Sequence, residues 1–183
     1  MLAPGLRRAV FGIGSNLGDR VSYVRLAVSD LRGLPGMHGA VRSQLYETAP
    51  VGGPAQGDYI NAALLVHTAW SARCLLEVAL EIELLHGRVR GERNGPRTLD
   101  IDLLWVEGEV VDEPSLTVPH PRLLERAFAL IPLLEVAPDA CDPVSGRPMA
   151  SWGRGLDLRG IRGVGGAGPV PWAAEGRECG PVA

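Results

Sequence analysis

Hydrophobic and polar residues follow two different periods along the first half of the chain. Residues 8–13 form a short apolar run rich in β-forming residues, and a turn that contains two glycines ends it. Apolar residues then recur at roughly helical spacing over residues 21–31, until Gly33 interrupts the pattern. The sequence therefore predicts a strand over residues 8–13 and a helix whose first turn is capped by the side chain of Asp19.

The following segments add two strands, a helix and another strand. A second strand is predicted over residues 41–46 and a third over residues 59–67, because each is an apolar run bounded by turn-forming residues. Ser71 is placed to cap a second helix, and a fourth, strongly apolar strand follows over residues 99–106. The order βαββαβ predicts an α+β protein with a ferredoxin-like plait, whose sheet carries both helices on one face and leaves the other available.

The remaining residues add a short strand, a helix and a tail to this prediction. The strand is expected over residues 116–118, and the helix over residues 123–134 with an interruption at Pro132. Beyond this point the sequence becomes rich in glycine and has too few apolar residues to hold itself in place. We therefore expect one domain over residues 1–151 and a poorly ordered tail over residues 152–183.

Composition restricts the class of function. The 183 residues, 46% of them hydrophobic and 21% charged, suit one globular domain, and a net charge of −3 argues against a general nucleic-acid-binding surface. All 18 basic residues are arginine, which excludes a Walker-type phosphate loop and a lysine Schiff base. No segment approaches the roughly 20 apolar residues of a membrane span. We expect a cytoplasmic monomer with no membrane or nucleic-acid partner.

The segment over residues 88–102 combines groups that bind phosphate with groups that bind metal. Guanidinium groups hold phosphate oxygens through forked hydrogen bonds, and two aspartates that alternate along a strand project from one face and suit a hard cation. Taken separately, the arginines also fit a solvated loop and the aspartates a solvated strand face. Taken together, they predict a site for a metal-bound polyphosphate. The residues concerned are Arg88, Arg90, Arg93, Arg97, Asp100 and Asp102.

Other residues are candidates for a second subsite. Tyr59 and Phe128 could stack on a flat heterocycle while Asn61 reads its hydrogen-bonding edge, although each also fits a structural role. His120 stands between two prolines, and Arg126 follows it, so both could contact an anion. A structural histidine is the alternative at this position.

Four motifs over residues 10–139 resemble the 6-hydroxymethyl-7,8-dihydropterin pyrophosphokinase family. The resemblance implies a ferredoxin-like core and transfer of the pyrophosphoryl group of ATP to the hydroxymethyl oxygen of 6-hydroxymethyl-7,8-dihydropterin, leaving AMP, with two Mg²⁺ ions. The motifs lie at residues 12–18, at residues 46–52 together with 58–62, at residues 88–102, and at residues 116–133.

The resemblance also implies roles for individual residues. Asp100 and Asp102 would bind the metal ions, and Arg88 and Arg97 would complete the catalytic set. The nucleotide would be bound by Arg88, Arg90, Arg97, Thr117, His120, Arg126 and Glu83. The pterin would be bound by Thr48, Ala49, Val51, Tyr59, Asn61, Asp100 and Phe128. One departure concerns Asn94, which stands where some members carry a tryptophan.

Two other classes of function are compatible with parts of this pattern. An RNA-binding plait would use the same arginines on phosphates, but the predicted strands lack the aromatic pattern of such domains and the net charge is negative. A sensor that keeps the pterin pocket without catalysis would not need both the acidic pair and the arginines. The enzyme is therefore the favoured prediction.

Overall fold

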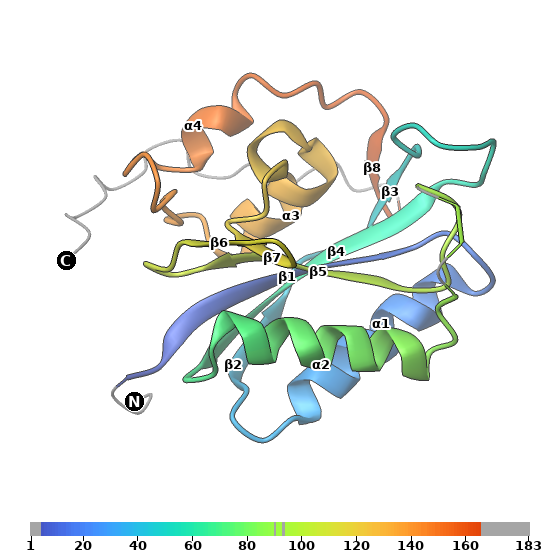
Figure 1. Cartoon of the computed structure of the whole chain (residues 1–183). Coiled ribbons are helices and arrows are strands. Elements are labelled where there is room, and N and C mark those ends of the chain that lie inside the picture. Colours follow the sequence, from blue (N-terminus) through green and yellow to red (C-terminus); the bar gives the residue numbers. More distant parts are fainter. Residues whose placement is uncertain (1–4, 90, 93, 166–183) are drawn as a thin grey trace.

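The protein has a mixed α/β fold built on an antiparallel sheet (Figure 1). The computed structural model describes residues 5–89, 91–92 and 94–165. The strands are β1 (Arg7–Ser15), β2 (His38–Arg42), β3 (Tyr46–Thr48), β4 (Tyr59–Thr68), β5 (Asp100–Val106), β6 (Val111–Glu113), β7 (Leu116–Val118) and β8 (Ile161–Gly163). The helices are α1 (Arg20–Gly33), α2 (Ala72–Leu85), α3 (Ala127–Val136) and α4 (Ala150–Gly153), with a 3-10 helix over Leu123–Glu125.

The central strand β1 pairs on both sides with strands that come much later in the chain. The sheet order is β5-β1-β4-β3-β8, β2 also pairs with β4, and all these pairings are antiparallel. Strands β6 and β7 form a separate two-stranded ribbon. The fourth, first and third predicted strands, β5, β1 and β4, therefore lie side by side at one end of the strand order.

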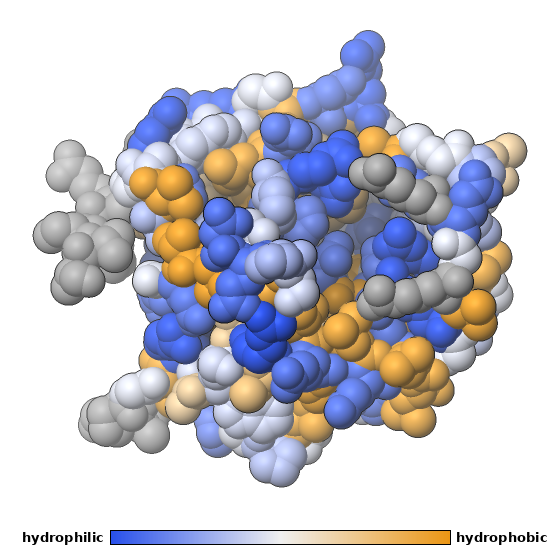
Figure 2. All heavy atoms as spheres, viewed as in Figure 1, coloured by the Kyte–Doolittle hydropathy of each residue, from blue (hydrophilic) through white to orange (hydrophobic). Residues whose placement is uncertain are grey.

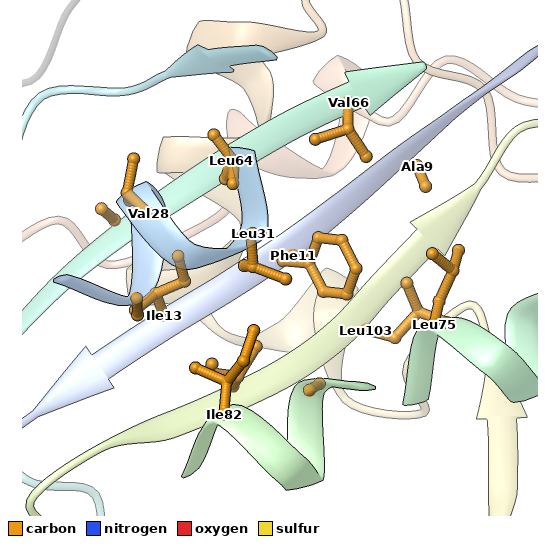
Figure 3. Close-up of a cluster of buried hydrophobic side chains, with 14 of the residues drawn as sticks. Ala9, Phe11, Ile13, Val28, Leu31, Leu64, Val66, Leu75, Ile82 and Leu103 are labelled. Atoms are coloured by element: carbon orange, nitrogen blue, oxygen red, sulfur yellow. The ribbon is translucent and has the colours of Figure 1, made fainter. Parts of the chain in front are cut away.

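The main hydrophobic core lies between the sheet and helices α1 and α2. Alternate residues of β1, namely Ala9, Phe11 and Ile13, are buried and point toward these helices (Figure 3). Leu31 of α1 and Leu75 of α2 belong to the same cluster. Because side chains alternate along a strand, the remaining residues of β1 face the other side of the sheet. On the surface seen in Figure 2, hydrophobic side chains form small groups separated by hydrophilic ones.

A second hydrophobic cluster covers part of the opposite face of the sheet. Val10, Leu104 and Trp105 contribute to it from β1 and β5, and Leu130 and Leu133 contribute from α3. Helix α3 therefore occupies one end of the face that the sequence predicted to be available. The other end remains open and forms the cavity described below.

Most of the predicted elements are confirmed. The first, third and fourth strands and the first two helices are present, as is the short strand over residues 116–118. Asp19 caps α1 by accepting the Ser22 amide at 3.1 Å, and Ser71 caps α2 by accepting the Cys74 amide at 3.3 Å. Local sequence signals were sufficient here because each element shows its own period and its own boundary residues.

The second predicted strand is wrong in its extent. The sequence predicts one strand over residues 41–46, but β2 ends at Arg42 and β3 begins at Tyr46. Ser43 explains the interruption, because its amide donates to the Ala63 carbonyl at 2.9 Å while its hydroxyl accepts the Ala63 amide at 2.9 Å. The Ser43 hydroxyl thus replaces a backbone carbonyl as the acceptor for the Ala63 amide, and regular backbone pairing of the two strands stops there.

The third predicted helix is interrupted at a different residue from the one expected. Arg126 has an extended backbone (φ −107°, ψ 102°) and separates the 3-10 helix from α3, whereas Pro132 lies inside α3. Pro132 lacks one backbone donor, but residues 129–134 are buried on all sides, so packing outweighs the lost hydrogen bond.

Part of the predicted tail is ordered against the sheet. Strand β8 pairs with β3, with Ile161 opposite Thr48 and Gly163 opposite Tyr46. The pattern of β8 is too short to be recognised from sequence, and the partner strand supplies its stability. Residues 166–183 lie outside the described residues. Among the described helices, none has both the length and the apolar character needed to cross a membrane.

Candidate active site

Two glycines of β1 form the floor of a cavity at the open end of the sheet. Gly12 lies opposite Asp102 on β5, while Gly14 lies between Asp100 on β5 and Asn61 on β4. A Cβ atom built on Gly14 would lie 3.0 Å from Oδ1 of Asn61. Because neither glycine has a side chain, the acidic pair and Asn61 border one continuous space.

Asp100 is paired with two arginines from the segment that precedes it. Its Oδ1 lies 2.6 Å from Nη1 of Arg88, and its Oδ2 accepts a hydrogen bond from Nη1 of Arg97 at 2.7 Å. The three side chains are mostly shielded from solvent, with exposed fractions of 15% for Arg88, 27% for Arg97 and 20% for Asp100. Two of the arginines predicted to bind phosphate therefore lie against one member of the acidic pair.

Asp102 differs from Asp100 in its contacts, although both lie on the same face of the same strand. Among the described residues it has no hydrogen bond or ion pair with another side chain, and it lines the cavity. Burial, the neighbouring charge of Asp100 and the charge of Glu83 raise the pKa of Asp102 to about 7. The cavity thus contains a carboxylate that no cation of the described chain neutralises directly.

Glu83 of α2 connects the arginine segment to the acidic strand from inside the protein. Its Oε1 accepts the backbone amide of Ile101 at 2.6 Å and also pairs with Nη1 of Arg88. The side chain is buried, and burial raises the pKa of its carboxyl group. The predicted contact of Glu83 with a nucleotide stays a prediction, since its carboxylate contacts protein groups here.

The opposite wall of the cavity is built by aromatic and amide side chains. Tyr59 and Asn61 come from β4, and Nδ2 of Asn61 donates to Oγ1 of Thr48 at 2.7 Å. This bond leaves Oδ1 of Asn61 on the side of Gly14. Phe128 of α3 lines the same cavity, and the guanidinium carbon of Arg126 lies 5.6 Å from the centre of its ring.

The other predicted site residues divide into two groups. Ala49 and Val51 line the cavity from the loop between β3 and β4. His120 and Thr117 do not belong to its lining. His120 nevertheless interacts electrostatically with Arg126 and Asp100. Burial, then the charge of Arg126, lower the pKa of His120, so its ring is neutral near pH 7. Arg90 lies outside the described residues.

Two residues that the sequence did not single out hold the loops of this site together. Asn16, just after β1, accepts the Arg97 amide at 2.7 Å through Oδ1. Its Nδ2 donates to Oε1 of Gln56 at 2.8 Å. Neither carboxamide belongs to a repeating pattern in the sequence. Their role is recognised only from their hydrogen-bond partners, which lie far away in the sequence.

The donor groups of the cavity suit magnesium. Asp100 and Asp102 offer carboxylate oxygens from neighbouring positions of one strand face, with no histidine or cysteine in the lining. Among the described residues, no group of three metal-ligating side chains occurs. Magnesium commonly takes one or two carboxylates and completes its shell with phosphate oxygens and water, so a carboxylate pair fits such an ion when a polyphosphate is bound with it.

Comparison with protein families gives one match that covers most of the chain. Residues 10–138 match the model of the 7,8-dihydro-6-hydroxymethylpterin-pyrophosphokinase (HPPK) family. This range contains all the residues that line the cavity.

Individual relatives agree with this match. A protein of Methylorubrum extorquens, named 2-amino-4-hydroxy-6-hydroxymethyldihydropteridine pyrophosphokinase, is 45% identical over 134 residues, which are 73% of this chain and 85% of the relative. A Bacillus subtilis protein of the same name is 42% identical over 132 residues, covering 70% of this chain and 77% of the relative.

The fold is similar to that of a much longer solved protein. The crystal structure of wild-type Plasmodium falciparum HPPK-DHPS matches with a TM-score of 0.61 and 14% sequence identity. The match covers 82% of this chain but only 44% of the Plasmodium chain, so the present chain spans less than half of that protein. At this identity the likeness concerns the fold alone.

Proposed function

The chain belongs to the 7,8-dihydro-6-hydroxymethylpterin-pyrophosphokinase family, and we infer from this that it transfers a pyrophosphoryl group to 6-hydroxymethyl-7,8-dihydropterin in folate biosynthesis. One structural observation carries the proposal for this chain. A single cavity is lined by Tyr59, Asn61 and Phe128 on one wall and by Asp100 and Asp102 on the other. A heterocycle and a polyphosphate could therefore be bound next to each other.

The pterin binds on the wall formed by β4 and α3. Tyr59 and Phe128 offer aromatic surfaces for a flat ring, and Gly14 leaves the depth that the ring needs. Asn61 offers a hydrogen-bonding edge whose orientation is fixed by Thr48. Ala49 and Val51 close this side of the cavity from the loop.

ATP binds on the side of the arginines. Arg97 lines the cavity directly, and Arg88 reaches the same carboxylate, so both guanidinium groups can transfer from Asp100 to phosphate oxygens. We assign Arg126, His120, Thr117, Glu83 and Arg90 to the nucleotide side on the basis of the family motif.

Asp100 and Asp102 would hold Mg²⁺ when ATP is bound. When bound, two such ions supply positive charge that neutralises the phosphates during transfer. Asp102 needs to lose its proton to serve as a ligand, and its pKa of about 7 makes this loss possible at neutral pH. Asp100 is already ion-paired, so a bound phosphate that takes over Arg97 would free Oδ2 of Asp100, and one that takes over Arg88 would free Oδ1.

The reaction proposed is a direct displacement. The hydroxymethyl oxygen of the pterin attacks the β-phosphorus of ATP, a new O–P bond forms, and the bond from that phosphorus to the bridging oxygen of AMP breaks. The hydroxyl proton is released, and AMP leaves. The protein acts through positioning and charge, since the cavity lining includes no lysine, cysteine or serine nucleophile among the described residues.

The strand order supports the finer assignment of a ferredoxin-like plait. Within the sheet, β5 and β4 flank β1, β3 lies beyond β4, and α1 and α2 share one face. The additional parts are α3, α4 and β8. We propose that β1, α1, β3, β4, α2 and β5 form the plait and that α3 completes the cavity.

Product analysis tests the proposed function. Purified protein is incubated with ATP, Mg²⁺ and 6-hydroxymethyl-7,8-dihydropterin, and nucleotide products are separated. The expected products are AMP and the pterin diphosphate in equal amounts. Release of ADP would identify an ordinary kinase, and binding of the pterin without any nucleotide product would identify a sensor. Either result would overturn the proposal.

A further inference from the structure

Glu135 is the only residue of α3 with a polar side chain. The other residues of the helix are apolar, and residues 129–134 are buried. Apolar packing has no preferred direction, so by itself it fixes only weakly where a helix lies along its own axis. The half-buried carboxylate of Glu135 accepts hydrogen bonds, which require defined distances and angles. Glu135 is therefore the residue of α3 that can set the position of this helix on the sheet.

The carboxylate of Glu135 contacts the segment where β2 ends and β3 begins. Its Oε1 accepts the backbone amide of Gln44 at 2.8 Å, and its Oε2 accepts the Tyr46 hydroxyl at 2.8 Å. The Tyr46 hydroxyl in turn accepts Nε2 of Gln44 at 2.9 Å. Gln44 lies between the two strands, whereas Tyr46 is the first residue of β3 and is fully buried. Two hydrogen bonds of good length thus join α3 to the sheet, and a third orients the hydroxyl that makes one of them.

Tyr46 shares a face of the sheet with residues from one wall of the cavity. It lies directly opposite Asn61 in the pairing of β3 with β4, and Thr48 lies opposite Tyr59. Residues opposite each other on neighbouring strands point to the same face, and so do alternate residues of one strand. The hydrogen bond from Asn61 to Thr48 agrees with this arrangement. Glu135 is thereby connected to the pair of strands that forms this wall.

Phe128 lies near the opposite end of the same side of α3. Phe128, Ile131 and Glu135 recur at intervals of three and four residues, so they lie on one side of the helix. In Figure 1, α3 lies on the face of the sheet opposite to α1 and α2. Glu135 contacts β3 at one end of this side, and Phe128 lines the cavity at the other. A movement of α3 that broke the contacts of Glu135 would therefore also displace the ring of Phe128.

We propose that Glu135 is a positioning residue that sets the distance between Phe128 and Tyr59, and with it the affinity for the pterin. This inference rests on the proposed function, because it assigns the pterin to the space between these two rings. A flat ring that contacts an aromatic surface on each side needs a gap of roughly 7–8 Å, which is two van der Waals separations. A displacement of α3 by about 1 Å should therefore weaken binding. Arg88 and Arg97 are not on α3, so the affinity for ATP should change much less.

Three substitutions remove different parts of these contacts. Glu135→Leu removes both acceptors at similar size. Tyr46→Phe removes only the hydroxyl and keeps the buried ring. Glu135→Gln keeps an oxygen that accepts the Gln44 amide and a polar group beside the Tyr46 hydroxyl, so it should restore most of the function. Val28→Ala, in the core on the other face of the sheet, is the control for a general loss of stability.

Pterin affinity is measured by calorimetry on protein saturated with a non-hydrolysable ATP analogue and Mg²⁺, and the affinity for the analogue is measured separately. We expect the dissociation constant for 6-hydroxymethyl-7,8-dihydropterin to rise about tenfold in Glu135→Leu, about threefold in Tyr46→Phe and less than about twofold in Glu135→Gln. The constant for the analogue should change less than about twofold in all three. Val28→Ala should keep both constants, although urea denaturation shows it to be less stable.

A double-mutant cycle tests whether Glu135 acts through Phe128. Glu135→Leu is compared in the unaltered protein and in Phe128→Ala by the same pterin titration. If Glu135 positions the ring, its substitution no longer matters once the ring is absent, and its effect should fall from about tenfold to less than about twofold. If Glu135→Leu fails to fold, Tyr46→Phe replaces it in both measurements.

Two results would overturn the positioning role and leave the proposed function standing, provided that the protein forms AMP. One is an unchanged pterin affinity in Glu135→Leu. The other is the same factor in the unaltered and Phe128→Ala backgrounds, which would show that Glu135 does not act through this ring. Absence of pterin binding in the unaltered protein would overturn both the positioning role and the proposed function.

Discussion

Oε1 of Glu83 accepts the backbone amide of Ile101 at 2.6 Å, between the two aspartates that face the cavity. Glu83 comes from α2 and is 2% exposed, so it contacts the acidic strand from the core side of the sheet. It also pairs with Arg88, whose other partner is Asp100. One buried carboxylate thereby fixes both the strand that carries the acidic pair and one of the arginines that neutralise it.

This arrangement predicts different effects for two substitutions of Glu83. Glu83→Ala leaves the buried Ile101 amide without an acceptor and should lower the free energy of unfolding by about 1–3 kcal/mol. Glu83→Gln keeps an acceptor for that amide and should lose less, while weakening the hold on Arg88. Urea denaturation of both variants checks the order. Equal losses would show that the amide contact contributes nothing beyond the ion pair.

Asp102→Asn should abolish AMP formation without unfolding the protein. The substitution keeps the shape of the side chain but removes the charge that a magnesium ion needs. Asp102 has no hydrogen-bond or ion-pair partner among the described side chains, so its replacement breaks no contact of this kind. Nucleotide analysis at increasing Mg²⁺ concentration, with circular dichroism as the control for folding, is the measurement. Normal turnover in the variant would remove Asp102 from the metal site.

The raised pKa of Asp102 predicts how stability depends on pH in the metal-free protein. The folded-state value of about 7 lies above the ordinary 3.8, so the folded protein holds this proton more tightly than the unfolded chain does. The resulting stabilisation is present below pH 3.8 and is lost as the pH rises through about 7. Asp102→Asn cannot ionise, so its stability relative to the unaltered protein should increase between pH 5 and pH 8.

Urea denaturation with a chelator present, at both pH values and on both proteins, gives this comparison. A stability difference that is the same at pH 5 and pH 8 would contradict the raised pKa. Adding Mg²⁺ with an ATP analogue should reverse the trend for the unaltered protein, because the bound cation favours the ionised carboxylate.

Gly14→Ala should weaken pterin binding while the fold stays intact. The new Cβ atom would lie 3.0 Å from Oδ1 of Asn61 and 3.6 Å from Cδ1 of Tyr59, and it would fill the floor of the cavity. We expect the dissociation constant for the pterin to rise about tenfold, equivalent to ~1.4 kcal/mol. Gly33→Ala is the control, because nothing lies within 4 Å of a Cβ atom there. Equal pterin affinity in the two variants would show that the ring does not lie over Gly14.

The sequence by itself determined the elements and the direction of the key side chains. Strand period places Asp100 and Asp102 on one face and Ile101 on the other, and the structure agrees, since Ile101 is buried with α1 and α2. The helix N-caps at Asp19 and Ser71 were also predicted from the sequence and are present in the structure. Each of these features depends on residues a few positions apart, where local geometry fixes the outcome.

Only the tertiary structure decided how these side chains are paired. Asp100 contacts two arginines while Asp102, two residues later, has no such partner, and the strand pattern treats them alike. The break of the second strand at Ser43 and the links through Gln56 likewise depend on partners far away in the sequence. A period repeats along the chain, but a hydrogen bond between distant residues depends on where the whole fold places both atoms, and no local pattern contains that information.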